Sequence, residues 1–374
     1  MLSARSFKPT VFVSLATLAI VLSAFGLAGA AVVTPPSPDL GTGTVVALIP
    51  VGDHPVALGY NSGNGYVYVA NFGRDFAPST VTVINRTTVV TTIGAGDHPT
   101  AVGYDSRNGY VYVTNRGDSA GPGNVTVIDG TSTVASIPDV SYPYGVAFNS
   151  ANGTVYVANL ASNTVTVING TTIVATIPVG MAPDALAYDS GNGYIYVANF
   201  YSNNVSVIGG TTVVASIPGV NHPRGVAYDS GDDYVYVTSE NNVSVISATT
   251  VVAKVPVGVV PEGLAYDSGN GYVYVANTGS NNVSVISRTT VVATITVSSP
   301  VGVAYDGGDE YVYVADDGAN FVTVISTATP PPGSFFGLPA IEGFLFLSGI
   351  VIAAVTSAVV LGLRRKRGVS PGRP

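Results

Sequence analysis

The sequence predicts an all-β fold, a seven-bladed β-propeller of four-stranded antiparallel blades, on three observations. First, a six-residue motif typified by YVYVAN recurs seven times, 38 to 44 residues apart, which is the period of a propeller blade. Second, each repeat holds four short runs rich in Val, Ile, Tyr and Thr, with Gly and Asn at the joints. Third, no run of helical period longer than a turn or two appears between residues 43 and 326. The motif copies begin at Tyr66, Tyr110, Thr154, Tyr194, Tyr234, Tyr272 and Tyr311.

The repeat at residues 183–219 gives the expected order of strands within one blade. The innermost strand (184–189) carries small residues, which we expect where blades converge on an axis. The second strand (194–199) is apolar on both faces, so we expect neighbouring blades to cover both sides. The third strand (204–208) alternates Val and Ile with Ser, which predicts a position nearer the periphery. A fourth strand (211–218) completes the blade.

The two ends of the repeat array differ in phase, and this predicts how the ring closes. A lone strand of the fourth type (44–52) opens the array, and the last repeat (300–326) ends with a third strand and lacks a fourth. We therefore expect the N-terminal strand to complete the last blade, because two open sheet edges would otherwise invite aggregation. The alternative is an open β-solenoid of similar repeats.

The segments outside the repeats predict export and a membrane anchor. Residues 1–30 combine basic residues, an apolar stretch and a small-residue cleavage site, as in a secretory signal peptide. A linker (31–43) precedes the repeats, and a Pro-rich stalk (327–340) leads to an apolar segment (341–363) that is long enough for a transmembrane helix. The basic tail (364–374) is expected to stay cytoplasmic, so the propeller faces the extracellular side at the cell surface. For residues 1–30, the alternative to a cleaved signal peptide is an uncleaved signal anchor. For residues 341–363, the alternative to a transmembrane helix is a buried core helix.

Composition excludes several kinds of chemistry. Residues 44–326 hold 20 acidic and 7 basic side chains, a net charge of −13 with His neutral, whereas nucleic-acid binding requires a basic face. The chain has no Cys, so disulfides and zinc–thiolate sites are excluded. It also lacks a phosphate-binding glycine loop, an HExxH motif and a nucleophile–His–acid spacing. The sequence therefore predicts no cofactor, no metal and no catalytic residue.

Seven N-x-S/T sequons make glycosylation a candidate modification of an exported chain. The alternative is that the sequons follow from the repeat pattern alone, since Asn is favoured in turns and Ser and Thr in strands. The sequons are at Asn85, Asn124, Asn152, Asn169, Asn204, Asn242 and Asn282.

The seven copies of YVYV[AT]N, each followed by strands of the NVSVI and TTVVATIPVG types, resemble the YVTN-repeat β-propellers of archaeal surface-layer and cell-surface antigen proteins. The resemblance covers about three quarters of the chain. The apolar segment with its RRKR tail after a Pro-rich stalk is similar to archaeal surface-protein anchors. The family implies a secreted or cell-envelope domain with a structural, adhesive or ligand-binding role, and it has no universal catalytic residues. Pro332-Gly333-Ser334-Phe335 departs from the PGF signal with which some such anchors are removed.

Candidate binding residues are found where the repeat varies most. One variable position follows the proline that opens each inner strand and is expected to line a mouth of the central channel: Val56, Thr100, Tyr144, Asp184, Arg224, Glu262 and Val301. The loops after the second strands share this face and are long in the first two blades (72–79 and 116–123). The candidate ligand-binding residues are Tyr144, Asp184, His222, Arg224 and Glu262, with Arg224 suited to an anion. The alternative is a cluster of salt bridges at the rim.

Two groups of residues resemble metal sites, the three histidines and the acidic joints, but turns explain both groups as well or better. His54, His98 and His222 occupy one repeat position, but the fifth blade lies across the channel from the first two, and ligands must lie about 2 Å from one ion. We interpret them as turn residues before Pro. The acidic joints at 229–233 and 306–310 resemble calcium loops, but hairpin turns explain their spacing equally well.

Together these features predict a membrane-anchored, outward-facing cell-envelope protein with a structural, adhesive or ligand-binding propeller. The expected partners are the membrane and other surface proteins or glycans. The alternative is an extracytoplasmic propeller enzyme, a lyase or hydrolase with its site at the channel mouth.

Overall fold

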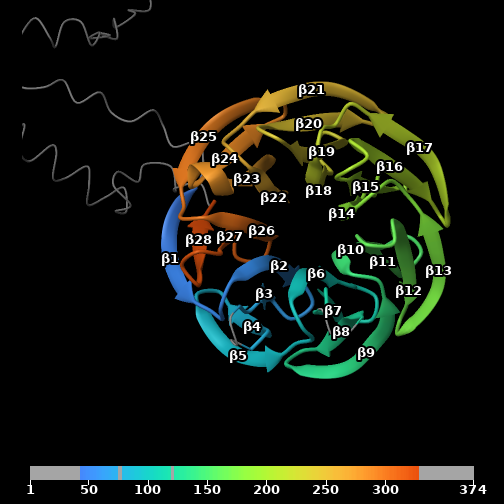
Figure 1. The fold of residues 1–374 in the computed structure, drawn as a ribbon. Helices are drawn as coiled ribbons and strands as arrows, with labels where there is room; N and C mark the ends of the chain where they lie inside the picture. Colours follow the sequence, from blue (N-terminus) through green and yellow to red (C-terminus); the bar gives the residue numbers. More distant parts are fainter. Residues whose placement is uncertain (1–42, 75–77, 119–121, 328–374) are drawn as a thin grey trace, which may run out of the picture. The chain divides into compact units, whose positions relative to one another are not determined.

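The structure, a computed structural model, describes residues 43–74, 78–118 and 122–327 (Figure 1). Seven four-stranded antiparallel sheets surround a central axis, which confirms the predicted seven-bladed propeller. The predicted signal peptide (1–30), membrane segment (341–363) and tail (364–374) lie outside the described residues, as do nearly all of the linker and stalk. Within the part of the chain that is described, no helix has the length and apolar character needed to cross a membrane.

Each blade is an independent sheet of four strands, listed here from the innermost outward. Blades 1 to 4 are β2 (Pro55–Asn61), β3 (Tyr66–Asn71), β4 (Thr80–Asn85), β5 (Thr88–Gly94); β6 (Pro99–Tyr104), β7 (Val111–Asn115), β8 (Gly123–Asp129), β9 (Ser132–Val140); β10 (Pro143–Asn149), β11 (Thr154–Asn159), β12 (Thr164–Asn169), β13 (Thr172–Pro178); and β14 (Pro183–Tyr188), β15 (Ile195–Asn199), β16 (Asn204–Gly209), β17 (Thr212–Pro218). Blades 5 to 7 are β18 (Pro223–Asp229), β19 (Tyr234–Ser239), β20 (Asn242–Ser247), β21 (Thr250–Pro256); β22 (Pro261–Asp267), β23 (Tyr272–Asn277), β24 (Asn282–Ser287), β25 (Thr290–Thr296); and β26 (Pro300–Asp306), β27 (Tyr311–Asp316), β28 (Phe321–Ser326), β1 (Thr44–Pro50). A short 3-10 helix, η1 (Thr278–Ser280), follows β23.

The N-terminal strand closes the ring as predicted. β1 pairs antiparallel with β28, from Thr44 opposite Ser326 to Pro50 opposite Phe321 (Figure 1). Ile49 of β1 is buried in the apolar layer between blades 7 and 1. The open solenoid is therefore excluded.

The hydrophobic core consists of apolar layers between neighbouring blades. In blade 4, Ile195 and Val197 pack with Tyr156 of blade 3, whereas Tyr196 packs with Val235 of blade 5. Each YVYV segment contributes to two layers in this way, and its last three residues are buried. The prediction that the second strand is covered on both faces is confirmed.

In six of the motifs, the buried tyrosine also ties its blade to the next by a hydrogen bond. The Tyr196 hydroxyl donates to the main-chain oxygen of Ala248 (2.7 Å), in the turn between β20 and β21 of blade 5. Asn192 Nδ2 donates to the same hydroxyl (3.0 Å). Equivalent tyrosine-to-carbonyl bonds are Tyr68–Gly130, Tyr112–Gly170, Tyr156–Gly210, Tyr236–Arg288 and Tyr313–Arg86.

Replacing Tyr196 with Phe should lower the free energy of unfolding by about 1 kcal/mol, because the hydrogen bond to the Ala248 carbonyl is lost. The matched control is Tyr194→Phe on the same motif, since Tyr194 is 36% exposed and its hydroxyl makes no hydrogen bond with the described residues. We expect the control to change stability by less than about 0.5 kcal/mol. Urea denaturation measures both, and equal losses would contradict a role for the hydroxyl between blades.

The third strand lies outside the second, as predicted, but it is buried, so its alternation does not reflect exposure to solvent. Ser206 of β16 is almost fully buried and accepts a hydrogen bond from Asn199 Nδ2 (2.9 Å), the last residue of the motif. The alternation of Val with Ser or Thr on this strand therefore serves hydrogen bonds inside the blade, and the exposed fourth strand forms the periphery. The corresponding pairs in other blades are Asn71–Thr82, Asn115–Thr126, Asn159–Thr166 and Asn277–Ser284.

Candidate functional site

A cavity of ≈ 450 Å³ lies on the propeller axis. Its wall includes the residue after the opening proline of every inner strand, as predicted: Val56, Thr100, Tyr144, Asp184, Arg224, Glu262 and Val301. Two positions further along each strand, a second ring of larger aliphatic side chains lines the cavity: Leu58, Val102, Val146, Leu186, Val226, Leu264 and Val303. The expectation that only small residues fit at the axis was therefore wrong for this second ring.

The small residues of the inner strands are explained by contact between neighbouring blades. A Cβ atom added to Gly225 would lie 2.3 Å from the main-chain oxygen of Glu262 on the next blade. Thr238 donates to that same oxygen (2.8 Å), and Thr114 donates to the main-chain oxygen of Tyr144 (2.8 Å). These contacts fix the backbone from which the Tyr144 and Glu262 side chains enter the cavity.

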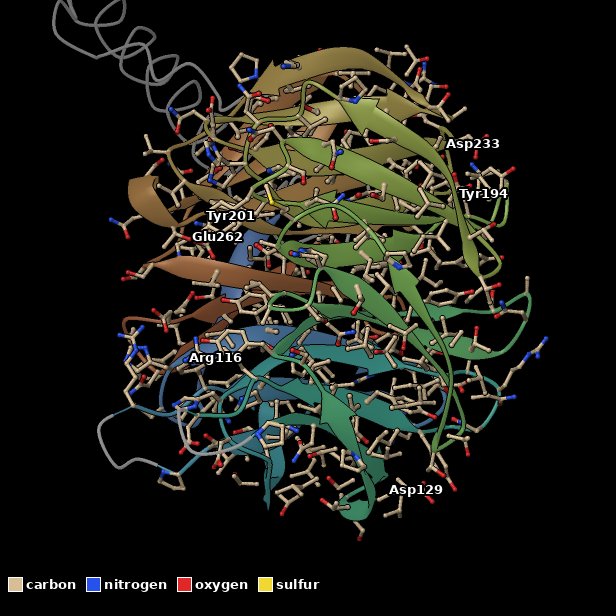
Figure 2. The ribbon with its side chains drawn as sticks, turned by 45° about the vertical axis from the view of Figure 1, so that its right-hand side comes forward. Arg116, Asp129, Tyr194, Tyr201, Asp233 and Glu262 are labelled. Atoms are coloured by element: carbon tan, nitrogen blue, oxygen red, sulfur yellow. The ribbon has the colours of Figure 1, made fainter. Side chains whose placement is uncertain are left out.

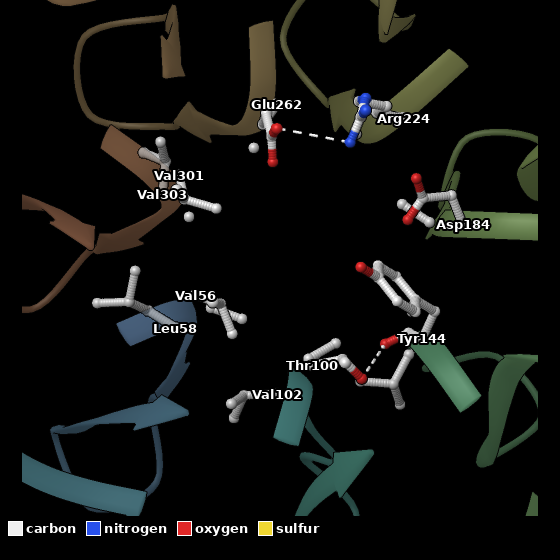
Figure 3. A pocket seen from close by; sticks show the side chains of 18 of the residues that line it. Val56, Leu58, Thr100, Val102, Tyr144, Asp184, Arg224, Glu262, Val301 and Val303 are labelled. Carbon is white, nitrogen blue, oxygen red and sulfur yellow. Dashed lines mark hydrogen bonds and ion pairs between the residues drawn. The ribbon is translucent and has the colours of Figure 1, made fainter. Parts of the chain in front are cut away.

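The cavity has a polar half and an apolar half (Figure 3). The polar half comes from blades 3 to 6 and consists of Tyr144, Asp184, Arg224 and Glu262. The apolar half comes from the inner strands of blades 7, 1 and 2 and consists of Val56, Leu58, Val102, Val301 and Val303. The loops after the second strands of these same blades add three charged side chains to the lining: Arg74, Arg116 and Asp317. A wall divided in this way suits a ligand with one polar side and one aliphatic side.

Burial alters the acidity of the polar half. The Arg224 guanidinium lies 3.5 Å from the Glu262 carboxylate. Loss of solvation raises the pKa of Asp184 to about 7 against the opposing effect of Arg224, and it also raises the pKa of Glu262. Burial raises the pKa of Tyr144 to about 12. Asp184 therefore exchanges its proton near neutral pH, while Tyr144 remains a hydroxyl donor.

Two arginines that line the cavity stack on aromatic rings. The Arg116 guanidinium lies 4.7 Å from the ring centre of Phe72 and 5.0 Å from that of Tyr142, and Arg224 lies 5.0 Å from the ring of Phe200. Figure 2 shows Arg116, Tyr201 and Glu262 toward one face of the propeller, and Asp129, Tyr194 and Asp233 toward the opposite face.

The structure brings four of the five candidate ligand-binding residues together in the polar half. His222 is not part of the cavity wall: its ring packs on Phe200, and its Nδ1 lies 3.6 Å from Glu240. Arg74, Arg116 and Thr278 also line the cavity. All three lie in loops after second strands, which the sequence analysis placed on this face, and the two arginines belong to the long loops at 72–79 and 116–123.

The three histidines serve as turn residues. All have positive φ angles, of 53°, 56° and 44° for His54, His98 and His222, directly before the proline of an inner strand. His54 Nδ1 lies 2.5 Å from Asp317, whereas the His98 ring contacts Phe72. In the described part of the chain, no group of three His, Asp or Glu side chains is placed to hold a metal ion.

The acidic joints form turns and ion pairs between blades. Asp229 Oδ1 accepts hydrogen bonds from the main-chain nitrogens of Gly231 (2.8 Å) and Asp232 (3.1 Å). Asp232 in turn pairs with Arg288 of blade 6 (2.7 Å). The same arrangement joins blades 7 and 1 through Asp306, Asp309 and Arg86. In both blades, an Asp that replaces the usual Asn of the joint faces an Arg in the turn of the next blade.

The seven sequons differ in accessibility. Asn85 and Asn169 are exposed, and their side chains make no hydrogen bond with the described residues. The half-buried sequon residues hydrogen-bond to the end of the second strand: Asn124, Asn204, Asn242 and Asn282. Asn152 is exposed, but its Nδ2 donates to the Tyr156 hydroxyl. The structure thus separates two free acceptors from five engaged ones.

In a host that N-glycosylates exported proteins, we expect glycan mass on Asn85 and Asn169 and little on Asn204, because the Asn204 amide is engaged on both sides. Peptide mapping measures the occupancy of each site. Asn85→Gln should remove one glycan, whereas Asn204→Gln should leave the mass pattern unchanged. High occupancy at Asn204 would contradict the sorting by accessibility.

Comparisons with solved structures agree with this fold. The chain is similar to the hydrazine synthase of Kuenenia stuttgartiensis (TM-score 0.65, 20% identity, 74% of this chain and 97% of that one). It is also similar to the WD40 β-propeller domain of Doa1 (TM-score 0.62, 13% identity, 76% of this chain and 97% of that one). A third similar structure is a functionally unknown protein from Desulfotomaculum acetoxidans (TM-score 0.58, 16% identity, 66% of this chain and 86% of that one). No family model and no curated protein sequence matches the chain. At these identities, the similarity establishes the propeller fold.

Proposed function

We propose that this protein is an outward-facing, membrane-anchored propeller of the cell envelope that binds a ligand in its axial cavity without chemically changing it. The observation that carries the proposal is the cavity wall, in which the residues that vary from blade to blade form a polar half opposite an apolar half. Repeated positions build the scaffold, and variable positions on a rigid scaffold are the usual place for binding residues. The apolar segment at 341–363 and its basic tail support the anchor.

Two measurements test the anchor and its orientation. Proteolysis of intact cells should release propeller peptides, and deletion of residues 341–363 should release the protein into the medium. Protection of the propeller in intact cells, with cleavage only after lysis, would contradict the outward orientation. If the propeller has a surface-layer or adhesive role, the released propeller should bind to cell envelopes prepared from cells that do not contain this protein.

The second candidate function is an extracytoplasmic enzyme, and one observation favours it. A pKa of about 7 for Asp184 is that of an acid–base catalyst, and the Tyr144 hydroxyl lies on the neighbouring blade. An enzyme would show turnover that Asp184→Asn abolishes with the fold intact. Binding without turnover, with the ligand recovered unchanged, favours the binding protein.

A further inference from the structure

Six charged side chains line the cavity, and four of them are paired with one another. Arg224 lies 3.5 Å from Glu262, and Arg74 lies 3.2 Å from Asp317. The remaining two, Asp184 and Arg116, make no ion pair with the described residues. One unpaired negative charge and one unpaired positive charge are therefore available to a ligand.

Arg116 is held in place without a partner for its charge. It follows β7 at the cavity mouth, and its guanidinium is stacked against both Phe72 and Tyr142. Its Nε is buried and has no hydrogen-bond partner among the described residues. A planar guanidinium fixed in this way is preorganised for a carboxylate, because little side-chain entropy is lost on binding.

Asp184 presents its carboxyl group to the cavity. Figure 3 shows it between Arg224 and Tyr144, pointing inward. It makes no hydrogen bond with the described residues, so a ligand donor would supply its first direct partner. A desolvated carboxylate of this kind favours an ammonium group, because the charges attract and the ammonium supplies the missing hydrogen bonds.

Asp184 and Arg116 belong to blades on either side of Tyr144. Asp184 is the second residue of β14 in blade 4, and Arg116 follows β7 of blade 2, with β10 of blade 3 between them. Burial raises the pKa of the Tyr144 phenol, and of the two charges Asp184 raises it further whereas Arg116 lowers it. The apolar half, defined above, faces this polar half across the cavity.

We propose that the axial cavity binds a small organic zwitterion with an aliphatic body, its ammonium group against Asp184 and its carboxylate against Arg116. This inference rests on the proposed function, in which the cavity binds a ligand. The aliphatic part would lie on the apolar half, and the volume of ≈ 450 Å³ falls within the usual range for small-molecule sites. The Tyr144 hydroxyl is placed to donate to the ligand between the two charged groups.

Binding of the ammonium group should strengthen as pH rises through about 7, because Asp184 must be ionised to attract it. The charged and titratable groups that face Asp184 are Arg224, which favours ionisation, and Glu262, which opposes it. Tyr144 also faces it and stays protonated in this range. The charge on Arg116 does not change over the same interval.

The test is calorimetric titration of the full chain with four probes of similar length: 6-aminohexanoate, hexylamine, hexanoate and hexanol. We expect 6-aminohexanoate to bind most tightly. Asp184→Asn should weaken it at least about tenfold and leave hexanoate unchanged, whereas Arg116→Gln should weaken it similarly and leave hexylamine unchanged. Glu240→Gln, outside the cavity wall, is the matched control, and circular dichroism checks the fold of each variant.

Equal affinity of the native protein and both variants for 6-aminohexanoate would overturn the proposal, as would equal affinity for all four probes. Absence of binding by 6-aminohexanoate would also overturn it. If a ligand of another class then bound in the cavity, the binding function would stand and only the zwitterion would be excluded. Surface exposure in intact cells is measured separately and does not depend on any of these results.

Discussion

Deletion of β1 (Thr44–Pro50) should abolish cooperative folding of the propeller. The deletion removes the antiparallel pairing with β28 and the buried Ile49, and it leaves blade 7 with three strands and an open edge. Each lost hydrogen bond contributes about 0.5–1.5 kcal/mol, so the several bonds of this strand together approach the total stability of a typical domain, about 5–15 kcal/mol. Thermal unfolding and size-exclusion chromatography should show loss of the transition and aggregation through the exposed strand.

The matched control is a deletion of equal length in the predicted linker, residues 34–40, which leaves β1 in place. It should leave the unfolding transition of the propeller within about 1 °C of that of the native protein, because the closing strand is retained. If both deletions left the transition unchanged, the N-terminal strand would not be what holds the ring closed.

Replacing Asp316 with Asn should stabilise the protein by about 1–3 kcal/mol at pH 7. Asp316 ends the motif of blade 7, where five other blades have Asn, and it is 3% exposed. The only hydrogen bond that its carboxyl group receives from the described residues comes from Thr323 (2.5 Å), and its Oδ1 has no partner among them. Burial raises the pKa of this carboxyl from 3.8 to about 6, so the ionised form present at pH 7 is the unfavourable one.

The pH dependence distinguishes this explanation from a general gain in packing. Because the folded state holds the Asp316 proton more tightly than the unfolded state, its contribution to stability is complete below about pH 4 and is lost as pH rises through about 6. The stability difference between Asp316→Asn and the native protein should therefore be small at pH 4 and reach its maximum above pH 7. Asp129→Asn, at an exposed strand end, is the control. A gain independent of pH would exclude the buried carboxylate as its cause.

The fold was predictable from the sequence because the same pattern of short strands and turns occurs seven times. The strand order, the number of blades and the closing strand all follow from the period and from the phase of its ends. The position of the third strand was also predictable, but its burial was not, because a Ser that alternates with Val fits both an exposed face and a hydrogen bond inside the blade. In Ser206, the hydroxyl accepts a hydrogen bond from buried Asn199, and nothing in its local pattern distinguishes this from exposure to water.

The candidate site was predictable in part. The variable position after each proline located Asp184, Arg224 and Glu262 in one cavity, because a strand that starts at the mouth must place this residue there. His222 was misplaced because its backbone turns with a positive φ angle and directs the ring onto Phe200. The sequence did not predict that Arg116 stacks on two aromatic rings and makes no ion pair with the described residues. Its stacking partners, Phe72 and Tyr142, come from two other loops, so only the spatial arrangement of the loops shows these contacts.

The apolar layer between blades 7 and 1 has a consequence for how the chain is made. Val67 and Val69 are synthesised early, but the residues that cover them, Tyr313 and Ala315, come nearly 250 positions later. A nascent chain therefore carries one uncovered sheet face until its last repeat emerges, and the slow step of folding should be this long-range closure. For a polypeptide that crosses a membrane unfolded, the delay is an advantage, since ring assembly waits until the whole chain has passed.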